Sequence, residues 1–120
     1  MVSSVLIVDD DPAFLAIAAR VLECMGVEVV GRAGDAAAAL DAAEATRPAA
    51  VLVDVGLPDR DGIDLAYELA GLPWEPKVVI TSSDADAGGA MDPRPEHLRL
   101  PFVPKADLTN GMLRRHLSGD

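Results

Sequence analysis

The sequence contains few aromatic residues, few cations and one cysteine. Phe, Trp and Tyr make up 3% of the 120 residues, so Ala, Val and Leu must build most of a core. The chain has ten Lys and Arg residues and twenty Asp and Glu residues, which gives a formal net charge of −10. Such a surface repels nucleic acid and anionic membranes, so we expect this domain to bind neither. Because the sequence has one cysteine, it cannot form an internal disulfide, and it lacks the cysteine ligands of a structural zinc site.

Long apolar runs are missing as well. No stretch has the roughly 20 residues that a transmembrane helix needs, and the N-terminal MVSSVLIV has no basic region before its apolar run, unlike a signal peptide. We therefore expect a cytoplasmic protein. The length fits a single domain over residues 1–120. Half of the residues are apolar, which argues against disorder.

Short apolar runs alternate with helical patterns along the chain. Predicted strands cover residues 5–8, 27–33, 49–55, 77–82 and 98–104. Predicted helices cover residues 12–25, 36–47, 61–70 and 109–117, and Asp11, Asp35 and Asp61 are predicted to stand at the first three helix starts. The two prolines of the last strand indicate an edge position. In the first helix, Ile17 is one of the apolar residues that recur at helical spacing, and Cys24, in the same apolar pattern, is expected to be a small core residue.

This alternation predicts an α/β fold with an open, doubly wound parallel sheet of five strands. The functional crevice of such a sheet lies at the carboxyl ends of its strands. Residues 84–99 should hold a fourth helix, but they contain several glycines and prolines. We therefore expect that helix to be short or absent.

Polar side chains stand at the predicted carboxyl ends of four strands. They are Asp9 and Asp10, Asp54, Thr81 with Ser82, and Lys105. Because these strand ends share one edge of a doubly wound sheet, we expect the side chains to converge. Carboxylates gathered in this way are compatible with a divalent cation. A plainer interpretation of Asp9 and Asp10 is a solvated acidic turn.

Four stretches together resemble the response-regulator receiver domain of two-component signalling, a CheY-like family. They are VLIVDDDP, VLVDVGLPDRDG, VVITSSD and FVPKADL, in the family's order and spacing. The resemblance covers nearly the whole chain. It implies a flavodoxin-like (βα)5 fold with strand order 2-1-3-4-5.

The resemblance also implies the chemistry of the site. Asp54 matches the phosphoacceptor, and a carboxylate can attack phosphorus to form an acyl phosphate. Mg²⁺ would be bound directly by Asp10, Asp54 and the backbone carbonyl of Gly56, with Asp9 acting through a water molecule. Lys105 would pair with Asp54 and then with a phosphoryl oxygen.

Two further residues match the switch of the family. Thr81 matches the hydroxyl that hydrogen-bonds the phosphoryl group, and Phe102 matches the aromatic residue that moves inward with it. Phe102 could instead be plain packing, and Thr81 an ordinary strand residue. Ala106 departs from the family, which usually has proline after the lysine.

The function implied is a phosphoacceptor switch that slowly hydrolyses its own phosphoryl group and is not a turnover enzyme. A histidine kinase or phosphotransfer protein would be the donor, and an unknown protein the target. The chain would be a monomer or a phosphorylation-dependent dimer.

Two other interpretations remain. A phosphorylation-independent interaction module is favoured by Ala106 and by the composition of residues 84–99. The other interpretation is an enzyme, either an aspartyl-phosphate phosphatase or a flavin-binding redox protein. A phosphatase of this type would normally show an Asp-x-Asp motif at the first strand. A flavin protein would need a loop rich in Ser, Thr and Gly after that strand. The adjacent acids of DDDP match neither pattern.

Overall fold

The computed structural model describes residues 3–83, 100–108 and 111–117. Its five parallel strands form one sheet in the order β2-β1-β3-β4-β5, which confirms the predicted order. The strands are β1 (Ser4–Val8), β2 (Glu28–Ala33), β3 (Ala50–Asp54), β4 (Lys77–Ser82) and β5 (Phe102–Pro104). The helices are α1 (Pro12–Cys24), α2 (Ala36–Thr46), α3 (Gly62–Ala70) and α5 (Met112–Leu117), with a 3-10 turn η2 (Lys105–Asp107) after β5.

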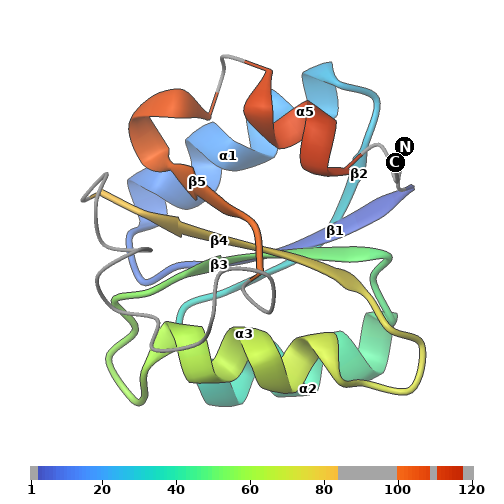
Figure 1. Cartoon of the computed structure of the whole chain (residues 1–120), viewed down its shortest axis with the longest axis vertical. Coiled ribbons are helices and arrows are strands. Elements are labelled where there is room, and N and C mark those ends of the chain that lie inside the picture. The colour runs from blue at the N-terminus through green and yellow to red at the C-terminus, as the bar shows by residue number, and fades with distance from the viewer. Residues whose placement is uncertain (1–2, 84–99, 109–110, 118–120) are drawn as a thin grey trace.

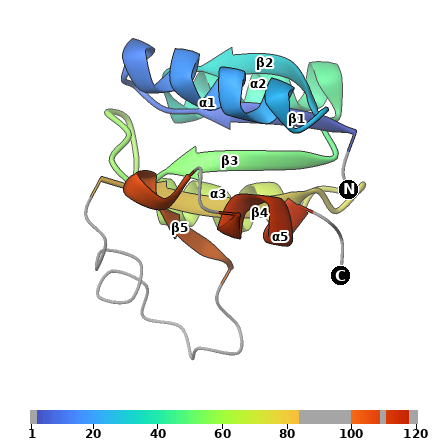
Figure 2. The ribbon, with the colours of Figure 1, turned by 90° about the horizontal axis from the view of Figure 1, so that it is seen from above.

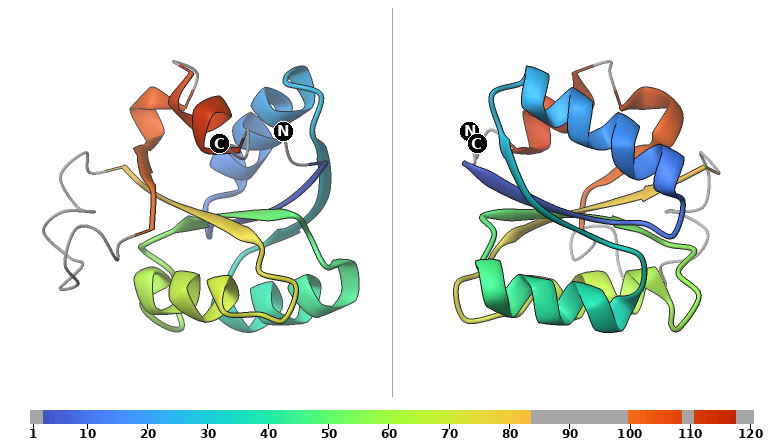
Figure 3. Two further views of the ribbon diagram at one scale, coloured as in Figure 1. Left: turned by 45° about the vertical axis from the view of Figure 1, so that its right-hand side comes forward. Right: turned by 180° about the vertical axis from the view of Figure 1, so that it is seen from behind.

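Helices cover both faces of the sheet. α1 and α5 lie on one face and α2 and α3 on the other (Figures 1 and 2). Alternate residues of β1 follow this division, because Val5 and Ile7 pack in the core on the α1 side while Leu6 and Val8 pack on the α2 side. Two-sided burial is the reason that the central strands are apolar throughout rather than alternating. Figure 3 shows the same three layers from two further directions.

All three predicted helix caps form. The carboxylates of Asp11, Asp35 and Asp61 accept hydrogen bonds from the amides of Ala13, Ala38 and Ile63, at 3.0, 2.7 and 2.8 Å. Each bond satisfies an amide that has no partner inside its helix. Local sequence therefore determines where these helices begin, and with them where the preceding loops leave the sheet.

The C-terminal third differs in detail from the prediction. β5 stands at the edge of the sheet, as its prolines indicated, but its three residues are fewer than the predicted 98–104. The last helix begins at Met112 in the described part of the chain. The short or absent fourth helix was predicted for residues 84–99, which lie outside the described residues.

The core assignment of Cys24 is wrong, and Ile17, from the same apolar pattern, lies outside the core as well. Both side chains are exposed, and 57% of Ile17 is accessible. The buried face of α1 instead runs through Phe14, Ala18 and Leu22. Ile17 and Cys24 are seven residues apart, about two helical turns, so they share a flank that the sheet does not cover. None of the helices in the described ranges is long and apolar enough to cross a bilayer.

Candidate phosphorylation site at the carboxyl edge of the sheet

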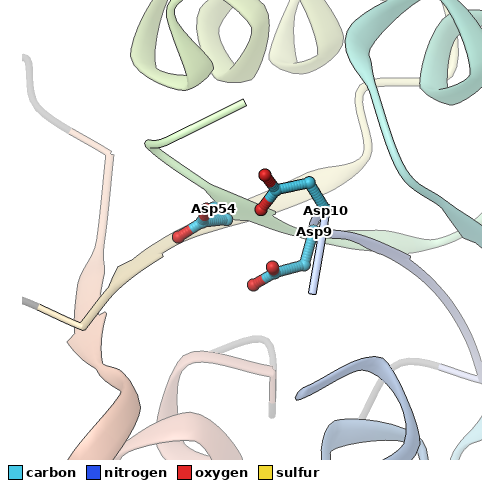
Figure 4. Close-up of side chains that lie close together, drawn as sticks. All are labelled: Asp9, Asp10 and Asp54. Atoms are coloured by element: carbon cyan, nitrogen blue, oxygen red, sulfur yellow. The ribbon is translucent and has the colours of Figure 1, made fainter. Parts of the chain in front are cut away.

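Three aspartates meet at the carboxyl edge of the central strands. Asp9 and Asp10 follow β1, and Asp54 ends the adjacent β3, where Val8 pairs with Val53. One oxygen of each carboxylate lies within 4.8 Å of the others. In Figure 4 the carboxylates of Asp9 and Asp10 point toward the side on which Asp54 lies. Parallel pairing of two neighbouring strands therefore brings together acids that are 44 residues apart or more in the chain.

The three carboxylates have different surroundings. Asp9 is fully buried, Asp54 is 6% exposed, and Asp10 is exposed to solvent. The Asp11 amide donates to Asp9 Oδ1 at 2.9 Å, and the Gly56 amide donates to Asp54 Oδ2 at 3.2 Å. Both buried acids are thus oriented by the backbone that follows them, while Asp10 is free to turn toward solvent or a ligand.

Lys105 joins this group from the turn η2 after β5. Its Nζ lies 2.7 Å from Asp9 Oδ2 and 3.5 Å from Asp54 Oδ1. The expected pairing with Asp54 is present, but the shorter ion pair is with Asp9. Burial lowers the pKa of Lys105, yet its contact with the Asp9 carboxylate and the two negative charges of Asp9 and Asp54 outweigh burial and leave the pKa raised. Lys105 is therefore positively charged at neutral pH and lies beside Asp54.

The carboxyl group of Asp54 has a raised pKa. Burial is the largest cause, and the negative charge of Asp9 adds to it, while Lys105 and the Gly56 amide act in the opposite direction. One lysine does not compensate the acids of this cluster. The oxygen-only donor set fits a hard divalent cation such as Mg²⁺, whose charge would stabilise the ionised form of Asp54.

The two predicted switch residues lie on β4 and β5. Thr81 pairs with Asp54 across β3 and β4. Its Oγ1 is buried and has no hydrogen-bond partner within the described ranges, which is uncommon for a buried hydroxyl. Phe102 pairs with Ile80, is half-buried and packs against the core on the α2 side. The hydroxyl is therefore available to a new acceptor beside Asp54.

A cavity of about 490 Å³ opens beside the acids. It is bounded by the loop after β1, the start of α1, the β3–α3 loop, the end of β4 and η2. Its lining includes Asp10, Phe14, Ile17, Asp54, Gly56, Ser82, Ser83 and Lys105. A group the size of a phosphoryl can thus reach Asp54 from solvent.

Two contacts were missed by sequence reasoning. The ring centre of Phe14 lies 4.3 Å from Lys105 Nζ. Asp59 in the β3–α3 loop accepts hydrogen bonds from the amides of Ala36 and Ala37 at the start of α2, at 2.8 and 3.1 Å. Phe14 stands about one helical turn after Asp10, which could have suggested it. Asp59 lies in a turn-like sequence that carries no signal for a partner 23 residues away.

Fold and site together define an open parallel α/β domain with an acidic pocket where the strand order reverses, the usual ligand edge of such sheets. Residues 5–92 match the family model of the response regulator receiver domain. The chain belongs to this family, which is a signalling domain of two-component systems.

Individual relatives agree with the family model. The chain is 42% identical over 78 residues to the transcriptional regulatory protein PdtaR of Mycobacterium tuberculosis, covering 65% of this chain and 38% of PdtaR. It is 36% identical over 85 residues to a protein-glutamate methylesterase/protein-glutamine glutaminase of Halobacterium salinarum, covering 68% of this chain and 24% of that protein. The chain thus spans less than two fifths of the length of these relatives.

Solved structures show the same fold. The response regulator PhyR from Brucella abortus superposes with a TM-score of 0.81 at 26% identity, over 98% of this chain and 48% of PhyR. A CheY-like receiver domain from Methylobacillus flagellatus superposes with a TM-score of 0.75 at 24% identity, over 97% and 99% of the two chains.

Proposed function

We propose that residues 1–120 form one receiver domain that serves as a phosphoacceptor switch. An oxygen of Asp54 attacks the phosphorus of a phosphohistidine on a histidine kinase or phosphotransfer protein. The bond from phosphorus to the imidazole nitrogen breaks, and its electron pair stays on the histidine. The observation that carries this proposal is the Asp54 carboxylate at the mouth of the cavity, 3.5 Å from a lysine and within 4.8 Å of two further acids.

In this proposal Asp10, Asp54 and the backbone carbonyl of Gly56 hold Mg²⁺, and Asp9 acts on it through water. Bound there, the ion would supply positive charge where an anionic phosphoryl group meets an anionic carboxylate. The exposure of Asp10 supports its direct role. The indirect role of Asp9 is supported by its burial and by its existing bonds to Lys105 and the Asp11 amide.

The ion pair that Lys105 makes with Asp54 would pass to a phosphoryl oxygen once Asp54 is phosphorylated. The Thr81 hydroxyl would donate to another phosphoryl oxygen, which would satisfy its hydrogen-bonding capacity. Phe102 would follow Thr81 inward. The lack of a partner for Thr81 Oγ1 in the described part of the chain supports this assignment. The readout would then pass to a downstream protein rather than to a chemical product.

The phosphodonor would approach over the flank of α1. Ile17 is an exposed apolar side chain on the lining of the cavity, and exposed apolar groups beside a site favour protein contact. We place this exchange in the cytoplasm and propose a monomer, or a dimer that forms on phosphorylation. Sedimentation of the protein with and without a phosphoryl group on Asp54 distinguishes the two states.

A phosphorylation-independent interaction module is the second candidate. Ala106 stands where the family usually has proline, directly after Lys105, and the shorter ion pair of Lys105 is with Asp9 rather than Asp54. Under this alternative the fold and its acidic pocket persist without phosphoryl uptake.

Phosphorylation by acetyl phosphate separates the two candidates. Wild-type protein with Mg²⁺ should gain one phosphoryl group by intact mass, whereas Asp54→Asn should gain none because an amide cannot form the acyl phosphate. Chelation of Mg²⁺ should stop the wild-type reaction. Wild type that stays unmodified, or Asp54→Asn that is modified equally, would contradict the proposed function.

A further inference from the structure

The ammonium group of Lys105 has a third neighbour besides its two carboxylates. Its Nζ lies over the ring of Phe14, 4.3 Å from the ring centre. A cation within about 6 Å of an aromatic centre is attracted by the negative face of the ring, more strongly when water is excluded. Phe14 is 7% exposed and the Lys105 side chain 19%, so water competes little with this contact.

Phe14 is set by the same short segment that orients the acids. Asp11 starts α1 through its bond to the Ala13 amide, and its own amide donates to Asp9. Asp11 thereby links Asp9 at the end of β1 to the first turn of α1, which carries Phe14. Lys105 arrives from the far end of the chain, on a short turn without a side-chain cap. The segment after β1 therefore presents the Asp9 carboxylate and the Phe14 ring to Lys105.

We propose that Phe14 is a positioning residue of the phosphorylation site. Its ring holds the Lys105 ammonium in the pocket beside Asp54, where a phosphoryl oxygen would meet it. The ring keeps its attraction when the charge on Asp54 changes, so the Lys105 ammonium stays over the ring while its ion pair passes from Asp54 to the phosphoryl group. This inference rests on the proposed function, because it assigns Phe14 a part in the same reaction.

Two variants distinguish the effect of the aromatic ring of Phe14 from the effect of its apolar volume. Phe14→Leu keeps an apolar side chain and removes the aromatic face. Phe14→Tyr keeps the face, and its hydroxyl has room because Phe14 lines the cavity. Should Phe14→Leu not fold, Phe14→Met is a second replacement without a ring, and its side chain is unbranched and adaptable.

The contact itself can be read without any reaction. Lys77 and Lys105 are the two lysines of the chain, so protein with ¹³C at lysine Cε gives two methylene signals, and Lys77 serves as an internal control. We expect the Lys105 protons to be shifted upfield by the ring in wild type and Phe14→Tyr. In Phe14→Leu that shift should vanish while the Lys77 signal stays unchanged.

The consequence is read from phosphorylation by acetyl phosphate. Phe14→Leu should react about fivefold more slowly than wild type at saturating Mg²⁺, and Phe14→Tyr should stay within about twofold. The Mg²⁺ concentration for half-maximal rate should be the same in all three, because Phe14 is not among the proposed Mg²⁺ ligands. A variant whose fold is damaged would instead change both the phosphorylation rate and the Mg²⁺ concentration for half-maximal rate.

The outcomes are distinguishable. If wild type takes up no phosphoryl group, the proposed function fails and the role of Phe14 fails with it. If wild type reacts and Phe14→Leu reacts equally fast, only the role of Phe14 is overturned. A Lys105 signal without a ring-current shift in wild type also overturns it. A slower Phe14→Leu with unchanged Mg²⁺ dependence and a lost shift supports it.

Discussion

Asp59 ties the β3–α3 loop to α2 at a single carboxylate. Its bond from the Ala36 amide, with a second from Ala37, lowers the pKa of Asp59. The helix dipole favours a negative charge at this position as well. Because the same loop carries Gly56, the bond helps to set the backbone next to Asp54. One exposed acid thereby couples the candidate site to a helix on the other side of the loop.

Replacing Asp59 by Asn should lower stability in a pH-dependent manner. With its pKa lowered in the folded state, Asp59 stabilises the fold fully above the ordinary value near 3.8. That contribution is lost as pH falls through the lower folded value. From about pH 6 down to about pH 5 the difference in unfolding free energy between wild type and Asp59→Asn should stay constant, and below about pH 4 it should shrink.

Denaturant unfolding across this pH range measures the difference. Asp41→Asn is a suitable control, because Asp41 is exposed and its carboxylate has no hydrogen-bond partner within the described residues. A difference for Asp59→Asn that stays constant with pH would contradict the assigned bonds.

At the scale of elements, α3 approaches the end of β3 at Gly62. A Cβ built on Gly62 would lie 2.0 Å from the backbone oxygen of Asp54. The Gly62 amide also donates to the Val55 carbonyl at 3.1 Å. The first turn of α3 thus packs directly on the backbone that carries the phosphoacceptor, and this is possible only without a side chain.

Gly62→Ala should destabilise the protein by about 3 kcal/mol, because the added methyl must push two backbone segments apart. Gly34→Ala is the matched control, since a Cβ there meets nothing within 4 Å, and its effect should stay within about 0.5 kcal/mol. Thermal unfolding of both variants measures the contrast. Equal stability of the two variants would contradict the close packing of α3 against β3.

The whole molecule carries an excess of acid, and three of its carboxylates gather at one edge of the sheet. Three carboxylates share one lysine there, and the formal net charge is −10. A divalent cation that binds only the folded protein stabilises it by mass action. Folding and metal binding should therefore be linked in this domain.

Mg²⁺ should raise the melting temperature. At about a hundred times its dissociation constant, linkage gives about 2.7 kcal/mol, or roughly 10 °C for a chain of this length. Asp10→Asn should remove most of the rise, and KCl of equal ionic strength should not reproduce it. Calorimetry makes the measurement. An equal rise in wild type and Asp10→Asn would show that the ion acts elsewhere.

The sequence by itself determined the order of the elements and the caps at Asp11, Asp35 and Asp61. These features depend on local spacing and on short-range hydrogen bonds, which a chain expresses without tertiary contacts. The sequence also predicted that the acids gather at one edge, because the carboxyl ends of parallel strands all lie on the same side of the sheet.

Only the tertiary structure decided the distances and the exposures. That Lys105 lies nearer to Asp9 than to Asp54, and against Phe14, depends on how α1 and η2 pack around the edge of the sheet. The exposure of Ile17 likewise depends on which flank of α1 the sheet covers. Helical periodicity identifies residues that share a face, but the partner of each face comes from packing between segments distant in the chain.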